Sequence, residues 1–204
     1  MTSVRVTSGL LSDAMDALGL PPNACGGFRL SAPGATACGR AFTLKQVAQS
    51  DMPDATARHG EAAENLLAPG DILVIDCPDG VDAATWGGGH TLRALGSRAA
   101  GILVNGAVRD LAILGQYDLP IMFRTTSPKR SKGRLVTAEI GATLAIKEVS
   151  ISPGDLVCFD SDGITSVPAA SLDAVLTKCA GIRDWEEQRD ARLKGLIAKT
   201  VSAP

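Results

Sequence analysis

The segment from Trp86 to Asp110 brings together residue types that suit the chemistry of small acids. Residues 87–89 are three consecutive glycines, and the absence of a Cβ lets the backbone turn tightly and approach a ligand. Arg109 can bind a carboxylate through two parallel hydrogen bonds, and Asp110 can bind a hard divalent cation. Together these groups predict a site for a small 2-oxo acid and a metal ion.

The elements that must position these residues can be predicted from the same segment. Residues 91–100 predict a helix, residues 101–104 a short buried strand, and Asn105-Gly106 a turn. A helix that begins after a glycine turn offers free N–H groups and the positive end of its dipole, which favours an anion. We therefore expect the glycines at the bound acid and the Arg-Asp pair beside it.

These residues also have plainer interpretations. A glycine run is typical of an ordinary loop, and adjacent Arg109 and Asp110 are typical of a solvated ion pair. His59 and His90 are the only histidines; His90 lies in the glycine loop, where it contacts a ligand or faces water at a helix start. The chain has no Gly-x-Ser-x-Gly motif, phosphate-binding loop or dinucleotide fingerprint, which argues against serine hydrolases and nucleotide enzymes.

Composition narrows the class of protein. The 204 residues suffice for one domain with a sizeable core, and 45% are hydrophobic but only 3% aromatic, so that core is mostly aliphatic. A net charge of −2 gives no reason to expect nucleic acid, which needs a concentrated basic surface. The one basic cluster, residues 129–134, is interpreted as a solvated loop or as a surface that faces an acidic small molecule.

The cysteines indicate a reduced protein. The chain has five, an odd number, and no two have the spacing of metal ligands. Cys77, Cys158 and Cys179 lie in apolar runs, as small core residues do. The N-terminus lacks a signal sequence and no apolar run approaches membrane-spanning length, so we expect a cytoplasmic chain without membrane contact.

Periodicity predicts a mixture of helices and strands along the chain. We expect helices at residues 8–18 (capped by Ser8), 55–67, 111–116 and 171–199, the last broken at Gly181. We expect strands at residues 38–48, 71–76 and 120–124, two strands within 135–151, and a hairpin from 156–159 and 164–167. With no repeat or linker, the pattern predicts one α/β domain over residues 1–204.

Four stretches carry a resemblance to a known family. WGGGHTLRALGSRAAGILVNGAVRD resembles a segment of the RraA-like family, which contains metal-dependent 4-hydroxy-4-methyl-2-oxoglutarate aldolases with oxaloacetate decarboxylase side activity and the RraA regulators of ribonuclease E. SGLLSDAMDALGL, APGDILVIDCPDG and ISPGDLVCFDSDGITSVPA resemble its first helix, central strand and closing hairpin. The resemblance implies the swivelling β/β/α (phosphohistidine-domain-like) fold, assembled as homotrimers or hexamers with the active site between subunits.

The resemblance also implies roles for individual residues. Asp110 corresponds to the aspartate that binds Mg²⁺ or Mn²⁺, and Glu186 or Glu187 to a glutamate that a neighbouring subunit's C-terminal helix supplies. The residues that correspond to the pyruvate-binding groups are Gly87, Gly88, Gly89, His90, Thr91 and Arg109.

The sequence departs from the aldolase pattern at two positions. The aldolases carry acids where this chain has Gly88 and Ile113, and the first of those acids helps to hold the waters of the metal. His90, Asp79 or Asp82 are candidates to compensate for the loss. The substrate beyond its pyruvate half and the choice between trimer and hexamer stay open.

The functional prediction is a divalent-metal lyase, an aldolase or decarboxylase, that acts on a pyruvate-containing 2-oxo acid. Arg109 and Asp110 are its predicted catalytic residues. One alternative is a non-catalytic RraA-like protein that binds and regulates a partner such as ribonuclease E. Another is a family member with a different small acid as its substrate.

Overall fold

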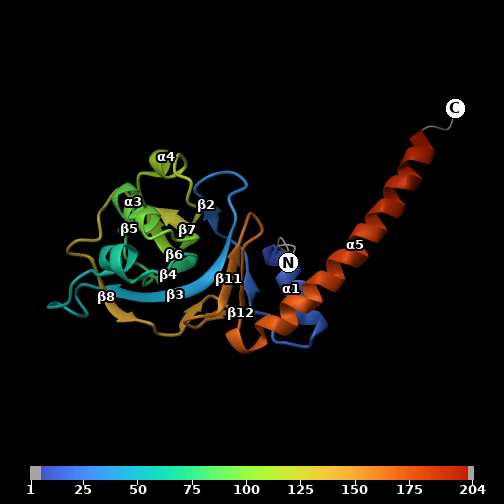
Figure 1. Ribbon diagram of the computed structural model, residues 1–204. Coiled ribbons are helices and arrows are strands. Elements are labelled where there is room, and N and C mark those ends of the chain that lie inside the picture. The colour runs from blue at the N-terminus through green and yellow to red at the C-terminus, as the bar shows by residue number, and fades with distance from the viewer. Residues whose placement is uncertain (1–5, 202–204) are drawn as a thin grey trace.

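A curved mixed sheet organises residues 6–201, which the computed structural model describes (Figure 1). The strands are β1 (Ala24–Cys25), β2 (Arg29–Leu30), β3 (Ala37–Ala48), β4 (Asp71–Asp76), β5 (Ala84–Trp86), β6 (Gly101–Val108), β7 (Ile121–Thr126), β8 (Leu135–Ile140), β9 (Leu144–Ile146), β10 (Val149–Ile151), β11 (Leu156–Phe159) and β12 (Ile164–Val167). The helices are α1 (Ser8–Ala17), α2 (His59–Glu61), the π-helical η1 (Ala62–Leu66), α3 (Gly88–Gly96), α4 (Leu111–Leu114), the 3₁₀ turn η2 (Ala169–Ser171) and α5 (Leu172–Val201).

The main sheet has the order β1-β12-β11-β3-β4-β6-β7-β2, with β5 added to β6 and β8 to β3, while β9 and β10 form a separate hairpin. Strands β3, β4, β6 and β7 run parallel to one another, whereas β3 pairs antiparallel with β11 and β8, and β7 with β2. Both β4 and β6 are buried on both faces over most of their length, as the apolar runs at 72–75 and 102–104 require.

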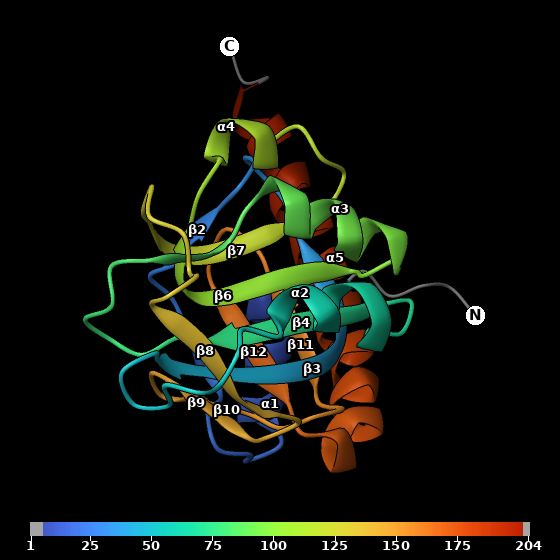
Figure 2. The same cartoon turned by 90° about the vertical axis from the view of Figure 1, so that its left-hand side faces the viewer.

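Apolar side chains fill the space on both sides of this sheet. On one side, Trp86 and Phe123 pack with η1, α3 and α4. Figure 2 shows α2 in front of β4, α3 beside β6 and α4 beyond β7. On the other side, the β9–β10 hairpin packs with β11 and β12, through residues such as Ile146 and Val157. A third cluster joins α1 to the first half of α5 through Leu11, Met15, Val175 and Cys179.

Parallel pairing sets the position of the predicted site. Trp86 at the end of β5 is the register partner of Val108 at the end of β6. Gly87 and Arg109 therefore leave the sheet side by side, at the edge where parallel strands end. Ligand sites of α/β sheets usually lie at this edge.

Several predicted elements are confirmed. The first helix, the strands at 38–48 and 71–76, and the closing hairpin lie within one residue of their predicted bounds. The helix cap is different from the prediction: Thr7 accepts the N–H of Leu10, while the Ser8 hydroxyl donates to Asp160.

Other predicted bounds are wrong. Asn105 and Gly106 continue β6 instead of turning, and a Cβ at Gly106 would lie 2.7 Å from Cys77 Sγ, so the glycine permits close packing. The helix at 91–100 instead runs from Gly88 to Gly96, and the helix at 55–67 shrinks to α2 and η1. Residues 135–151 hold three strands, and α5 is continuous through Gly181 and runs from 172 to 201.

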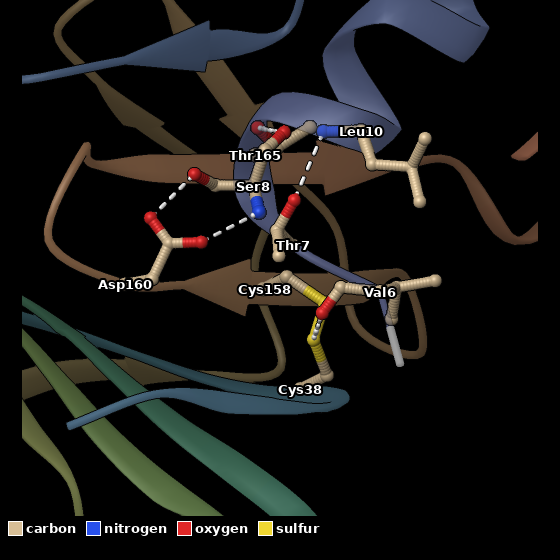
Figure 3. Close-up of a disulfide and its surroundings, with 8 residues drawn as sticks. All are labelled: Val6, Thr7, Ser8, Leu10, Cys38, Cys158, Asp160 and Thr165. Atoms are coloured by element: carbon tan, nitrogen blue, oxygen red, sulfur yellow. Dashed lines mark hydrogen bonds between the residues drawn. A yellow bond between two sulfur atoms is a disulfide. The ribbon is translucent and has the colours of Figure 1, made fainter. Parts of the chain in front are cut away.

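The cysteines are not all reduced. Cys38 on β3 and Cys158 on β11 are register partners and form a disulfide (Figure 3). The prediction of a fully reduced chain is therefore wrong, because the antiparallel pairing of two strands far apart in sequence was not foreseen. Cys25, Cys77 and Cys179 are free and buried, and the last two confirm their prediction as core residues. The cytoplasmic location stays a prediction.

Helix α5 divides into a packed and a projecting part. Its first turns lie on α1, and the rest extends away from the sheet (Figure 1). Its exposed apolar side chains include Trp185, Leu193, Leu196 and Ile197. No helix among residues 6–201 combines the length and the apolar character that crossing a membrane requires.

Candidate active site

The first turn of α3 meets the end of β6 through a backbone hydrogen bond to Asp110. Gly87 is the N-cap of α3, and the N–H of Gly88 donates to Asp110 Oδ2 at 3.3 Å. Asp110 is in the left-handed region, with φ 60° and ψ 33°. Aspartate tolerates this conformation better than most residues, and such backbone outliers concentrate at functional sites. The carboxylate is thus held against the glycine turn.

The three glycines have different surroundings. A Cβ at Gly87 would lie 2.8 Å from Asp110 Oδ2 and 3.1 Å from Arg109 Cγ, so that position has no room for a side chain. A Cβ at Gly88 would meet only Ile113 and Asp110, at 3.7 and 4.0 Å, and one at Gly89 would meet nothing within 4 Å. Only Gly87 is therefore required by close approach.

Arg109 is placed by the same junction. Its N–H donates to the carbonyl of Trp86 at 2.9 Å, and its side-chain Nε lies 3.8 Å from Asp110 Oδ2. Both side chains remain partly exposed, at 44% and 41%. At this distance and exposure the ion pair is weak, so both groups stay available to a ligand.

A pocket of about 130 Å³ lies over these residues, with lining residues that include Gly87, Gly89, His90, Arg93, Arg109, Asp110, Arg130 and Ser131. Three arginines and one aspartate line it, so its net charge favours an anion. The basic loop reaches this pocket because the N–H of Ala84 on β5 donates to the carbonyl of Lys129 at 2.7 Å and Ala84 forms a parallel bridge with Arg130.

Two of the predicted substrate-binding residues do not line this pocket. The Gly88 N–H is used by Asp110. Thr91 is fully buried; its hydroxyl accepts from the Trp86 indole N–H at 3.0 Å and donates to the Gly87 carbonyl at 3.2 Å. Thr91 therefore holds the glycine turn from the protein interior. Four of the predicted residues line the pocket: Gly87, Gly89, His90 and Arg109.

The two histidines meet beside the pocket. His59 Nε2 lies 3.0 Å from His90 Nε2, and His59 is only 3% exposed. Burial, followed by the nearby His90 and Arg93, lowers the pKa of His59 to about 3. Burial, followed by Arg93 and Arg109, lowers the pKa of His90 to about 4. Both rings are therefore neutral near pH 7.

The donor set at Asp110 fits a hard divalent cation of the magnesium type. Magnesium commonly uses one or two carboxylates and fills its other positions with water and substrate oxygens. Asp110 supplies one partly exposed carboxylate, and no cluster of three or more acidic, histidine or cysteine ligands exists within residues 6–201. Neither Gly88 nor Ile113 adds an acid. Asp79 pairs with Arg124 and Asp82 with Lys129, and neither lines the pocket, whereas His90 lines it together with Asp110.

The predicted glutamates lie on α5, away from this site in the same chain (Figure 1). Glu186 Oε1 lies 3.6 Å from Arg189 Nη2, and Glu187 Oε1 lies 3.8 Å from Arg183 Nε. One chain thus does not bring them to Asp110, and their role across a subunit boundary stays a prediction.

Sequence analysis missed several residues around the pocket. Arg93 lies one helical turn beyond His90, a spacing that would have identified it once α3 was known to begin at Gly88. His59 and Gln46 come from elements far from the glycine segment, so no local pattern reveals them.

Comparison with known proteins places these features in context. The RraA-like family model, described as Aldolase/RraA, matches residues 9–165. The protein DlpA of Legionella pneumophila is 30% identical over 96% of this chain, which spans only 31% of DlpA. A Halalkalibacterium halodurans protein, provisionally named a 4-hydroxy-4-methyl-2-oxoglutarate aldolase, is 30% identical over 72% of this chain and 75% of its own length.

Solved structures extend the likeness to the fold. RraAS2 of Streptomyces coelicolor, described as an unusual member of an RNase ES inhibitor family, superposes with a TM-score of 0.80 at 25% identity, over 91% of this chain and 92% of its own. RraA of Thermus thermophilis, described as an RNA-processing inhibitor, gives a TM-score of 0.65 at 25% identity, over 81% of this chain and 94% of its own. The predicted fold class is confirmed.

Proposed function

The chain belongs to the RraA-like (Aldolase/RraA) family, and from that membership and the geometry of the site we propose that it is a divalent-metal-dependent lyase. Its substrate is a pyruvate-containing 2-oxo acid, with 4-hydroxy-4-methyl-2-oxoglutarate and oxaloacetate as the first candidates. The observation that supports this most directly is the position of Arg109 and Asp110 against the first turn of α3.

Each residue contributes through its own chemistry. The Arg109 guanidinium binds the carboxylate of the 2-oxo acid. The N–H of Gly89 and the positive end of the α3 dipole favour negative charge on the 2-oxo oxygen. Asp110 would hold Mg²⁺ or Mn²⁺, and the bound ion would supply Lewis-acid chemistry.

The proposed reaction breaks one carbon–carbon bond. In aldol cleavage, the C4 hydroxyl loses its proton, the C3–C4 bond breaks, and its electron pair becomes the enolate of pyruvate, which is then protonated at C3. Decarboxylation of oxaloacetate releases CO₂ and reaches the same enolate. Arg109 and the α3 amide stabilise this more negative oxygen better than the starting ketone, and such differential stabilisation lowers the barrier.

Pyruvate release from both substrates, with Mg²⁺, with Mn²⁺ and with a chelator, tests the proposal. We expect metal-dependent release, and we expect Asp110→Asn to lower metal affinity and turnover by about tenfold or more, because an amide keeps the shape but loses the charge. Asp79→Asn is the matched control, since Asp79 is 89% exposed and does not line the pocket. Equal loss in the two variants, or turnover indifferent to metal, would contradict the proposal.

Assembly completes the proposed site. In this proposal the protein is a homotrimer or hexamer, and Glu186 or Glu187 of a neighbouring subunit would join Asp110 in holding the cation. The projecting part of α5 supports this, because it extends away from the sheet and carries exposed apolar side chains such as Leu196 and Ile197.

A second candidate function is a non-catalytic RraA-like regulator. The absence of carboxylates at Gly88 and Ile113 favours it, as does the likeness to the two RraA structures. Binding to purified ribonuclease E, combined with no pyruvate release under any metal condition, would select this candidate over the lyase.

A further inference from the structure

The disulfide lies where the sheet meets the two helices α1 and α5. Cys38 near the start of β3 and Cys158 in β11 are register partners and form the bond. Cys158 is only 1% exposed and belongs to the apolar cluster that joins α1 to the first half of α5 through residues such as Leu11 and Val175. The bond is therefore part of the surface on which both helices pack.

The start of α1 is held at the same junction (Figure 3). The N–H and the hydroxyl of Ser8 donate to the Asp160 carboxylate, at 2.8 and 2.6 Å, and Asp160 directly follows β11. The hydroxyl of Thr165 on β12 donates to the Ser8 carbonyl at 2.8 Å. The position of α1 thus follows that of the β11–β12 hairpin, which the disulfide attaches to β3.

The strand pairing around the disulfide is short. Strands β3 and β11 are in register only over residues 37–40 and 156–159. On its other side β11 pairs with β12, which in turn pairs with the two-residue strand β1. With few hydrogen bonds to hold it, the pairing of β3 with β11 depends on the covalent bond more than a long pairing would.

The two bonded sulfur atoms differ in their access to solvent. Cys38 is half-buried and lines a groove of about 470 Å³ together with Thr7, Thr36 and Asp160. Cys158 is buried and does not line this groove. A disulfide is opened by a thiolate that reaches one of its sulfur atoms, and partly exposed disulfides are typically the labile or regulatory ones. Attack on this bond therefore begins at Cys38.

The three other cysteines do not compete for this chemistry. Cys25, Cys77 and Cys179 are free but buried. Burial raises the pKa of each of these thiols, so they stay protonated at pH 7. Because the thiolate is the reactive form, thiol–disulfide exchange in this chain is confined to the bond between Cys38 and Cys158.

We propose that the Cys38–Cys158 bond is a redox switch, opened at Cys38 by a dithiol, that sets how firmly α1 and α5 are held on the sheet. A thiolate of the dithiol bonds to Cys38 Sγ, the Cys38–Cys158 bond breaks, and Cys158 Sγ takes the electron pair and then a proton. The second thiol of the dithiol displaces Cys38 in the same way. The chain thus gains two electrons and two protons, and the dithiol is oxidised to a disulfide.

Opening the bond loosens the two helices and leaves the centre of the sheet packed. Two separate thiols need more room than a disulfide, and a close-packed cluster passes that change on to neighbours such as Leu11 and Val175. The side chains of β4 and β6 belong to the other two clusters. Neither Cys38 nor Cys158 lines the pocket over Asp110, so the switch does not depend on the proposed lyase activity.

Two single variants test where the bond opens. Cys158→Ser leaves Cys38 as a free thiol, and Cys38→Ser leaves Cys158 as its matched counterpart, so both variants lack the bond. With oxidised glutathione as the probe, we expect Cys38 to form the mixed disulfide at least about tenfold faster than Cys158, because only Cys38 lines the groove. Mass spectrometry of the protein and its peptides measures both rates. Equal rates, or a faster reaction at Cys158, would overturn the proposal.

Hydrogen exchange of the wild-type protein tests what the bond controls. We expect dithiothreitol, without denaturant, to open the bond and to make the amides of residues 8–17 and 172–182 exchange about tenfold faster, while residues 71–76 and 101–108 keep their rates. The double variant Cys38→Ser, Cys158→Ser should show the fast exchange in both helices with or without dithiothreitol.

Three results would reject the switch. The first is a bond that dithiothreitol opens only in denaturant. The second is a reduced protein whose α1 and α5 exchange as slowly as in the oxidised one, which would leave the disulfide as a plain crosslink. The third is an equal acceleration in β4 and β6, which would mean that reduction destabilises the whole domain and not the two helices.

Discussion

At the scale of single residues, the three glycines of the turn differ in whether a side chain would fit. It would not fit at Gly87, but it would at Gly88 and Gly89. Gly87 lies against the side chains of Asp110 and Arg109. A Cβ added at Gly88 would lie 3.7 Å from Ile113, an ordinary contact, and Gly88 does not have a positive φ. The turn therefore tolerates a side chain at position 88, where the resemblance to the aldolases implies an acid.

We predict that Gly88→Asp increases metal affinity, by up to about tenfold, because an added carboxylate can accept hydrogen bonds from the waters of the metal. Gly88→Ala should leave affinity unchanged, and Gly87→Ala should reduce it by displacing Asp110. Metal titration by calorimetry checks all three. A loss with Gly88→Ala equal to that with Gly87→Ala would show that position 88 also requires glycine.

The buried His59 predicts a particular pH dependence of stability. The pKa of His59 is lowered in the folded protein to about 3. Between the ordinary pKa of about 6.5 and this value, the unfolded chain binds a proton at His59 and the folded chain does not. As the pH falls from about 6.5 toward 3, His59 therefore lowers the free energy of unfolding by up to about 1.4 kcal/mol per pH unit.

Replacement by an uncharged side chain removes this contribution. We expect His59→Gln to be less stable than the wild type at pH 7, and we expect the difference to narrow as the pH falls toward 4. Urea unfolding at several pH values measures it. Parallel curves for the two proteins over this range would contradict the lowered pKa.

At the scale of elements, the disulfide links β3 to β11 across a sequence separation of 120 residues. A crosslink over a long loop stabilises mainly by restricting the unfolded chain, typically by about 2–4 kcal/mol. We expect a reducing agent to lower the melting temperature of the wild type. A variant with Cys38→Ala and Cys158→Ala should start lower and show no response to reduction; a response there would point to another bond.

The elements also show what could be predicted from sequence and what could not. Strands β4, β11 and β12 and helix α1 follow local patterns, and the sequence predicted them closely. The stretch around Gly106 was misjudged because its glycine serves contact with Cys77, a residue that periodicity does not place nearby. Arg109 and Asp110 could be proposed because they belong to the glycine segment itself, and they line one pocket, whereas His59 reaches His90 from a distant element that local patterns do not reveal.

At the scale of the whole molecule, the projecting end of α5 is the least explained surface. Trp185 is 60% exposed and borders a groove of about 920 Å³ that also includes Leu18 and Ile182, remote from Asp110. Apolar exposure of this kind is typical of a contact surface.

We predict a trimer or hexamer by light scattering, and we predict that Trp185→Lys lowers the mass toward that of the monomer, because a charge opposes burial of this face. Thr177→Lys at the groove edge is a milder companion variant. A monomeric mass for the wild type at working concentrations would remove the basis for a shared site.

The pairing of β3 has a consequence for how the protein is made. One edge of β3 pairs with β4, but its other edge pairs with β11 and β8, and β1 pairs with β12. On the ribosome, the parallel strands from β4 to β7 emerge early, while that second edge stays open until the last third of the chain appears. Unpaired strand edges invite aggregation, and pairings between distant segments form slowly. During synthesis, the open edge of β3 thus exposes the nascent chain to aggregation until β8 and β11 pair with it.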